Sequence, residues 1–225
     1  RNWLDRGNRA VPISVNVTRI DIYTVDVVAC FCGLVEKYRL DPSLIEIEIT
    51  ESAYAENYNI IKETVEELRK SGFTVLMDDF GSGYSSLNML KDVNVDILKI
   101  DMKFLDMSEE SADRGVGILE AISSMARLMG IRVIAEGVET KEQVDFLLDM
   151  GCIYAQGYYF YKPMPVDVLE PLLEDVNKVD FRGIKARAIE RFRIKDIFRE
   201  NVFSETMMNN ILGGIAFYHV FRDEV

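Results

Sequence analysis

The sequence predicts an α/β protein whose parallel sheet closes into a TIM-like (β/α)8 barrel, incomplete at its N-terminus. Two observations predict it. Short apolar runs alternate with longer segments of helical periodicity, and helices between consecutive strands imply a parallel sheet. A polar residue marks the C-terminal end of each run, and these residues are Asn16, Glu48, Asp78, Lys99, Glu136 and Gln156. They lie 20 to 37 positions apart, close to the ~30 residues of one strand–helix–strand unit.

The alternation alone also fits a doubly wound open sheet. In a parallel sheet the C-terminal ends of all strands share one edge, and this is where (β/α)8 barrels carry their chemistry. An open sheet would scatter six marked strand ends along that edge, whereas a closed barrel gathers them around one centre. We therefore favour the barrel.

The predicted strands are short runs of alternating or continuous apolar character. They cover residues 11–17, 44–50, 75–79, 95–100, 131–135 and 153–156. The third strand runs into two adjacent carboxylates, Asp78 and Asp79. Because successive strand side chains point to opposite faces, these two can converge only if the strand ends there, and Gly81 and Gly83 allow the chain to turn.

The predicted helices alternate with these strands. They cover residues 1–8, 25–38, 57–71, 114–129, about 141–150 and 166–176. Thr24 is a plausible N-cap of the helix at 25–38, and Thr140 with Gln143 forms a capping box before the helix at 141–150. On the long helix at 114–129, helical spacing puts Ile118, Ile122, Met125 and Leu128 on the inward face.

Composition excludes several classes of function. The 225 residues carry a net charge of −12, which argues against long nucleic acid, because that ligand needs a basic face. No apolar run approaches the ~20 residues of a membrane span. We interpret Cys30, Cys32 and Cys152, which lack zinc-ribbon spacing, as reduced thiols in the core of a cytoplasmic protein. The only histidine is His219, so a metal here must be held by oxygen, which favours Mg²⁺ or Mn²⁺.

The C-terminal part of the chain differs in charge from the rest. Residues 181–200 carry seven Lys or Arg against three Asp or Glu. We divide the chain into a partial barrel at 1–180, a basic helical linker at 181–202, and a segment at 203–225 that faintly resembles the start of a PAS-type domain. A terminal helix packed on the barrel is the alternative.

Six motifs follow one another in a specific order. They are SVNV (14–17), EITES (48–52), DDFGSGYSSL (78–87), LKID (98–101), AEGVET (135–140) and AQGY (155–158). Together they resemble the EAL-domain phosphodiesterases, which hydrolyse cyclic di-GMP. Each motif alone is weak, but six in order over roughly residues 10–170 are specific.

The resemblance implies a site with two metal ions, Mg²⁺ or Mn²⁺. The implied ligands are Asn16, Glu48 and Asp78 for the first ion, and Asp78, Asp79 and Glu136 for the second. Lys99 is implied to orient the attacking water, and Glu136 to act as general base when one metal is bound. Asp79 completes the implied catalytic set.

The resemblance also implies residues that support the site or contact the substrate. Glu51, Asp101 and Glu139 are implied to support the loop at 80–86 and the metal cluster. Gln156, Gly81, Ser82 and Tyr158 are implied to contact the substrate. The expected partners are cyclic di-GMP, a second copy in a homodimer, and further signalling domains fused to the same chain.

One feature of the family is absent. The Glu-Ala-Leu motif lies upstream of the Asn16 strand in the family, and its glutamate is a further ligand of the first metal. Six barrel strands are predicted here where the family has eight. We therefore expect weak or no turnover for residues 1–225 alone. The alternatives to a phosphodiesterase are a receptor that binds cyclic di-GMP without cleaving it and a structural dimerisation barrel.

Overall fold

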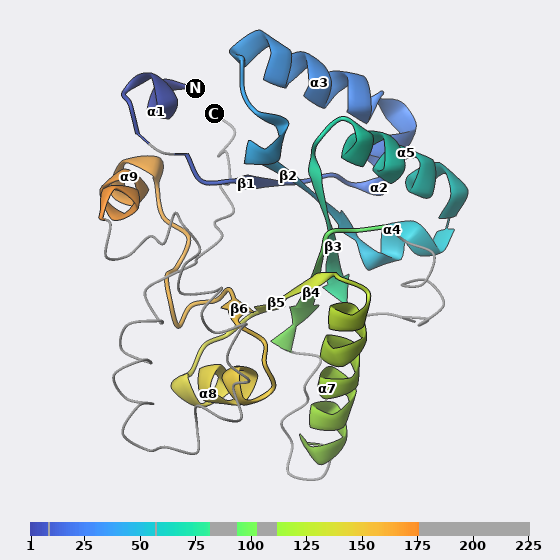
Figure 1. The fold of residues 1–225 in the computed structure, drawn as a ribbon, viewed down its shortest axis with the longest axis vertical. Coiled ribbons are helices and arrows are strands. Elements are labelled where there is room, and N and C mark those ends of the chain that lie inside the picture. The colour runs from blue at the N-terminus through green and yellow to red at the C-terminus, as the bar shows by residue number, and fades with distance from the viewer. Residues whose placement is uncertain (9, 57, 82–93, 103–111, 176–225) are drawn as a thin grey trace. The chain divides into compact units, whose positions relative to one another are not determined.

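A computed structural model describes residues 1–8, 10–56, 58–81, 94–102 and 112–175. Six strands form one sheet in the order β1-β2-β3-β4-β5-β6, and the pairs β1–β2, β2–β3, β3–β4 and β5–β6 are parallel. Helices occupy the connections between strands (Figure 1). The predicted α/β class and the parallel sheet are therefore confirmed. The chain divides into two compact units, Arg1–Val133 and Ile134–Val225, which are described in turn.

The first unit is built on four strands whose C-terminal ends carry the polar residues. These strands are β1 (Ile13–Asn16), β2 (Ile45–Thr50), β3 (Thr74–Phe80) and β4 (Ile97–Asp101). The middle strands form the core, because residues on both of their faces are buried. The register aligns Asn16 with Glu48 and Thr50 with Asp78, so these polar residues share one edge.

On the edge strand β1, the polar residue Ser14 is buried while its apolar neighbours and Asn16 are exposed. Ser14 is 8% exposed, whereas Ile13 and Val15 are 45% and 36% exposed. Ser14 lies opposite Glu46 in the register, and its hydroxyl donates to that carboxylate across 3.3 Å. A polar pair therefore occupies the interior side of the sheet here.

The helices of the first unit are more numerous than predicted. They are α1 (Asn2–Asp5), α2 (Arg19–Thr24), α3 (Val27–Tyr38), the 3-10 helix η1 (Pro42–Leu44), α4 (Glu51–Glu56), α5 (Tyr58–Lys70) and α7 (Ala112–Leu128). The prediction of Thr24 as the cap of α3 is wrong. Asp26 caps this helix by accepting from the Ala29 N–H across 2.9 Å, because Val25 is extended and separates α3 from α2.

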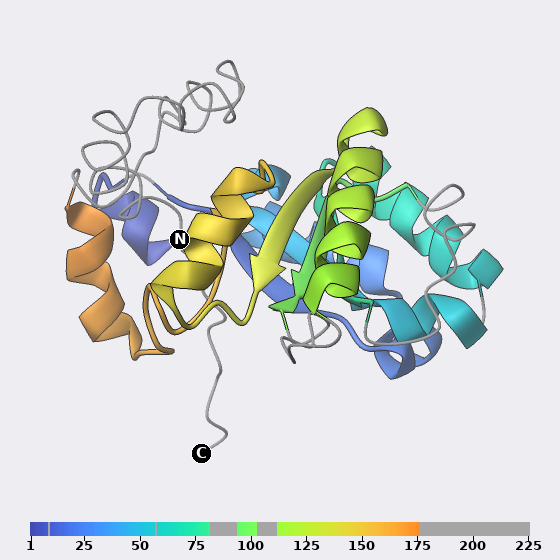
Figure 2. The ribbon, with the colours of Figure 1, turned by 90° about the horizontal axis from the view of Figure 1, so that it is seen from below.

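Helix α7 runs beside β4 (Figures 1 and 2) with a buried face displaced from the predicted one. Leu119 and Ile122 are buried, whereas Ile118 is 47% and Leu128 is 90% exposed. The predicted inward position is therefore confirmed for Ile122 and wrong for Ile118 and Leu128, and Met125 is half-buried. The helix contains apolar residues on several faces, so helical spacing alone could not identify the face that packs.

The second unit holds most of β5 (Arg132–Glu136), then α8 (Lys141–Asp149), β6 (Tyr154–Ala155) and α9 (Val166–Glu174). The predicted capping box of α8 is confirmed. The Thr140 hydroxyl accepts from the Gln143 N–H, and the Gln143 side chain accepts from the Thr140 N–H. The linker and further domain predicted at 181–225 lie outside the described residues. Of the three cysteines predicted to lie in the core, Cys152 is buried, whereas Cys30 is exposed and Cys32 is half-buried. Among the helices that are described, none has the length and apolar character needed to cross a membrane.

Candidate functional site

The site begins with a buried lysine that joins three neighbouring strands. The Lys99 Nζ on β4 lies 2.9 Å from Glu48 Oε2 on β2 and 3.3 Å from Asp78 Oδ1 on β3. Lys99 is 1% exposed and Glu48 2% exposed. A buried ammonium group is tolerated only when charged partners compensate its lost hydration. Three ionisable residues therefore form one internal cluster at the strand ends.

Asn16 lies next to this cluster along the sheet. It is the last residue of β1 and pairs in register with Glu48. Its amide therefore lies at the same edge as the carboxylates of β2 and β3. A cavity of about 470 Å³ opens beside it, lined also by Thr18, Arg19, Thr50 and Ser52. Sequence reasoning did not assign these four to the site, because their approach to one another depends on how α2 and α4 follow β1 and β2.

Asp79 reaches the site through an unusual backbone conformation. The strand does not end at the pair Asp78 and Asp79, as predicted, but continues to Phe80 with a shift in register between Met77 and Phe80. Within this irregularity Asp79 has a φ of 56°, a left-handed conformation that is uncommon for residues other than glycine. The Asp79 N–H donates to Asp78 Oδ1 across 2.9 Å. The irregularity thus brings two adjacent carboxylates together without ending the strand.

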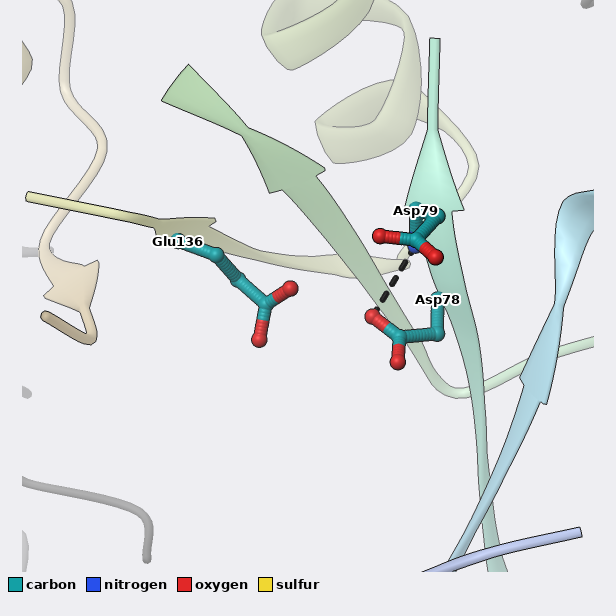
Figure 3. A group of neighbouring side chains, drawn as sticks. All are labelled: Asp78, Asp79 and Glu136. Carbon is teal, nitrogen blue, oxygen red and sulfur yellow. Dashed lines mark hydrogen bonds between the residues drawn. The ribbon is translucent and has the colours of Figure 1, made fainter. Parts of the chain in front are cut away.

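Three carboxylates form the most acidic part of the site. Oxygens of Asp78, Asp79 and Glu136 all lie within 4.8 Å of one another. In Figure 3 the Glu136 carboxylate, at the end of β5, points towards the two aspartates. Carboxylates this close repel one another unless a cation or a proton intervenes. A donor set made only of oxygen fits a hard divalent cation such as Mg²⁺ or Mn²⁺.

The segment that leaves β3 is held by a buried glutamate. The Gly81 N–H donates to Glu51 Oε2 across 2.9 Å, and Glu51 is 4% exposed. Gly81 has a φ of 97°, which favours glycine. The structure therefore places Glu51, from the start of α4, against the first residue after Phe80. Ser82, predicted to contact substrate, lies outside the described residues.

A further buried carboxylate, that of Glu46, lies two residues before Glu48 on β2. Glu46 is 3% exposed, and burial raises its pKa, although the Ser14 hydroxyl bond acts in the opposite direction. The sequence showed that Glu46 shares a face with Glu48 but offered no partner for it. Ser14 could have been identified only from the strand register, which the sequence does not specify.

The remaining predicted residues lie at or near the ends of β4, β5 and β6. Asp101 is the last residue of β4 and half-buried. Glu139 is exposed, and its N–H donates to Gln143 Oε1 across 2.7 Å, so its backbone belongs to the α8 cap. Tyr158 is 58% exposed, with the Lys162 Nζ 5.6 Å from its ring centroid.

Backbone contacts around Gln156 fix the segment that follows Glu136. The Gln156 N–H donates to the Ala135 carbonyl across 2.7 Å, and the Gln156 carbonyl accepts from the Val138 N–H across 3.1 Å. Gly157 packs so closely that an added Cβ would lie 2.1 Å from the Val138 oxygen. The chain on both sides of Glu136 is therefore held by the β6 segment.

Comparison with known proteins gives one family. The EAL domain model matches residues 1–163. The cyclic di-GMP phosphodiesterase NbdA of Pseudomonas aeruginosa is 35% identical over 167 residues, which cover 74% of this chain and 21% of NbdA. The chain thus spans about a fifth of that relative's length.

Two solved structures are similar in fold. The crystal structure of the EAL domain of Mycobacterium smegmatis DcpA matches with a TM-score of 0.70 and 33% identity, covering 76% of this chain and 77% of that one. The manganese and cyclic di-GMP complex of Klebsiella pneumoniae BlrP1 matches with a TM-score of 0.63 and 27% identity, covering 71% and 40%. The six-stranded parallel sheet is consistent with an incomplete TIM-like barrel of this kind.

Proposed function

Because the chain belongs to the EAL domain family, we propose that it hydrolyses cyclic di-GMP to linear pGpG with the help of divalent metal ions. Two kinds of support come from its relatives. NbdA is a cyclic di-GMP phosphodiesterase, and BlrP1 forms a complex with manganese and cyclic di-GMP. The whole protein's substrate and cytoplasmic location are part of the same proposal.

The proposed metal ligands are the oxygen donors at the strand ends. Asn16, Glu48 and Asp78 would hold one ion, and Asp78, Asp79 and Glu136 a second. Support for the second set is the approach of its three carboxylates to within 4.8 Å. Bound Mg²⁺ or Mn²⁺ would supply positive charge and Lewis acidity at the phosphodiester. That two ions bind, and that they are Mg²⁺ or Mn²⁺, are both parts of this proposal.

Lys99 is proposed to position the water that attacks phosphorus. Its ammonium group offers three hydrogens and approaches Glu48 and Asp78, so its position is set by two proposed ligands. A fixed cation beside the developing negative charge lowers the energy of the transition state. Glu136 is proposed as the general base that accepts the water proton when a single metal is bound. Asp79 is proposed as the third catalytic residue beside Lys99 and Glu136.

The proposed supporting and substrate-binding residues surround this centre. Glu51 would keep the segment after β3 in place through its bond to the Gly81 N–H. We assign the same supporting role to Asp101 and Glu139. Substrate contacts are assigned to Gly81, Ser82, Gln156 and Tyr158.

The observation that carries the proposal is the buried cluster of Lys99, Glu48 and Asp78 beside the carboxylates of Asp79 and Glu136. Its test is incubation with cyclic di-GMP and Mn²⁺, followed by chromatographic detection of pGpG. We expect pGpG to form once the upstream segment with the Glu-Ala-Leu glutamate is present, and little or none with residues 1–225 alone. Binding without product from the extended chain would support a receptor instead, and neither binding nor product would support a structural barrel.

A further inference from the structure

The cavity beside Asn16 lies between the segments that follow β1 and β2, and its volume is about 470 Å³. One part of its lining comes from the start of α2, and another from the end of β2 and the start of α4 (Figure 1). Asn16, a proposed ligand of the first metal ion, belongs to the same lining. The cavity therefore adjoins the place where the proposed function puts a phosphodiester group of the substrate.

The lining combines one positive charge with apolar and hydroxyl groups. Among the described residues that line the cavity, Arg19 carries the single charge, and it is half-buried. The apolar residues of the lining are Val17, Ile20 and Ala53. A cavity whose described lining has no carboxylate is unsuited to a further cation. Apolar walls with a few well-placed donors instead fit a flat organic group that carries hydrogen-bond acceptors.

The backbone on both sides of Arg19 is held in place. Before it, the Val17 N–H donates to the Glu48 carbonyl across 2.8 Å, which ties this segment to β2. Around it, Thr18 and Asp21 form the reciprocal capping box of α2. A backbone held in this way sets the position of Arg19 before a ligand arrives, and such preorganisation lowers the entropic cost of binding.

We propose that this cavity receives one guanine base of cyclic di-GMP and that Arg19 recognises that base, an inference that rests on the proposed function. Guanine presents two acceptors, O6 and N7, on one edge, and an arginine can donate to both at once. Adenine keeps the N7 acceptor but carries an amino donor in place of O6. The guanidinium group of Arg19 would therefore meet a donor instead of an acceptor, so Arg19 would select guanine over adenine.

The lining favours a base over the second phosphate of the substrate as the occupant. Cyclic di-GMP has two phosphates and two bases, and the proposed metal ions at the strand ends take one phosphate. A second phosphate placed against Val17, Ile20 and Ala53 would lose hydration without a matching gain, whereas the faces of a base bury apolar surface there. The volume also suits a base with its ribose, because ligand pockets begin at about 300 Å³.

The first test compares cyclic di-GMP with cyclic di-AMP as ligands of residues 1–225 by isothermal titration calorimetry in the presence of Mn²⁺. Little or no turnover is expected of residues 1–225, so binding is measured directly. We expect the parent to bind cyclic di-GMP at least about tenfold more tightly than cyclic di-AMP. Arg19→Met should lose most of this preference by weakening the guanine ligand alone, and thermal unfolding checks that the fold survives.

Arg127→Met is the matched control for the loss of a positive charge. Arg127 is exposed in the last turn of α7 and is not part of the cavity lining. We expect this variant to keep the preference of the parent for guanine.

The second test removes a single acceptor from the ligand. A cyclic dinucleotide with 7-deazaguanine bases lacks N7 and is otherwise the same shape. We expect the parent to bind it several-fold more weakly than cyclic di-GMP, and Arg19→Met to bind the two equally.

The outcomes separate this proposal from the proposed function. Equal weakening of both cyclic dinucleotides in Arg19→Met would show a contact to phosphate and would overturn the recognition of guanine by Arg19. An unchanged preference in Arg19→Met, an equal loss in Arg127→Met, or a parent without preference would overturn it as well, while cyclic di-GMP remained the ligand. A parent that binds neither dinucleotide would contradict the proposed function together with this inference.

Discussion

Lys99 and Glu48 form an ion pair whose side chains are each 1% exposed, with 2.9 Å between Nζ and Oε2. Because Asp78 also lies 3.3 Å from the same Nζ, one lysine compensates two carboxylates. This arrangement makes the site sensitive to the loss of a single positive charge.

Replacing this lysine tests its electrostatic role. In Lys99→Met, two carboxylates lose their shared cation, and breaking a buried pair costs about 3–5 kcal/mol. We expect urea unfolding in EDTA to show a loss of this size, with Mn²⁺ restoring part of it. Lys70→Met, an exposed change at the end of α5, is the control. A loss below about 1 kcal/mol in Lys99→Met would show that the cluster is not electrostatically coupled as described.

The close approach of Gly157 to Val138 predicts that a side chain at position 157 would displace the backbone. In Gly157→Ala the new Cβ would lie 2.1 Å from the Val138 oxygen, so the segment after Glu136 must shift. We expect a lower melting temperature and weaker Mn²⁺ binding by calorimetry.

Gly117→Ala provides the matched control for that change. Gly117 is inside α7 and has no atom within 4 Å of an added Cβ, so alanine should stabilise the helix by about 0.5–1 kcal/mol. Equal, small effects of the two substitutions would contradict the packing described for Gly157.

The cap of α2 predicts a dependence on pH. The Thr18 side chain and N–H donate to Asp21 Oδ2 across 2.6 and 2.8 Å, and these bonds lower the pKa of Asp21 from 3.8. A lowered pKa in the folded state contributes stability above the ordinary value, and this is lost as the pH falls through the folded value. We expect Asp21→Ala to cost at most about 1 kcal/mol at pH 7, because the lost bonds to Thr18 lie at a solvent-exposed site, with the difference shrinking below pH 3.8.

That expectation is checked by urea unfolding at pH 7 and pH 3. Asp149→Ala, at the exposed end of α8, controls for the loss of an acidic group. If the cost of Asp21→Ala were the same at both pH values, the charge of Asp21 would not be responsible for it.

The sequence predicted the elements of the fold better than their orientations. Alternating apolar runs located every described strand, and the capping box of Thr140 and Gln143 was recognisable because both residues lie within one turn. The buried face of β1 was not predictable, because alternation defines two faces without showing which one packs. The buried Ser14 lies opposite Glu46 on β2 and donates to its carboxylate. That contact depends on the register between β1 and β2.

For the site, too, the sequence predicted which residues take part better than how they are arranged. The polar strand ends were visible in the sequence because their spacing follows the strand–helix repeat. The left-handed backbone of Asp79 was not, because the motif predicted a strand end where the structure has a register shift. The bond between Glu51 and the Gly81 N–H joins residues 30 positions apart, so local pattern does not reach it, and Glu51 was assigned to this loop only through the family resemblance.

The central claim is that acids from separate strands form one site for divalent cations. The most direct measurement is the melting temperature with and without millimolar Mn²⁺, for the parent chain, for Asp78→Asn with Asp79→Asn, and for Glu63→Gln on the exposed surface of α5. We predict that Mn²⁺ raises the melting temperature of the parent and of Glu63→Gln but leaves the double variant unchanged. A melting temperature that Mn²⁺ does not alter in the parent, or raises equally in all three, would contradict the account.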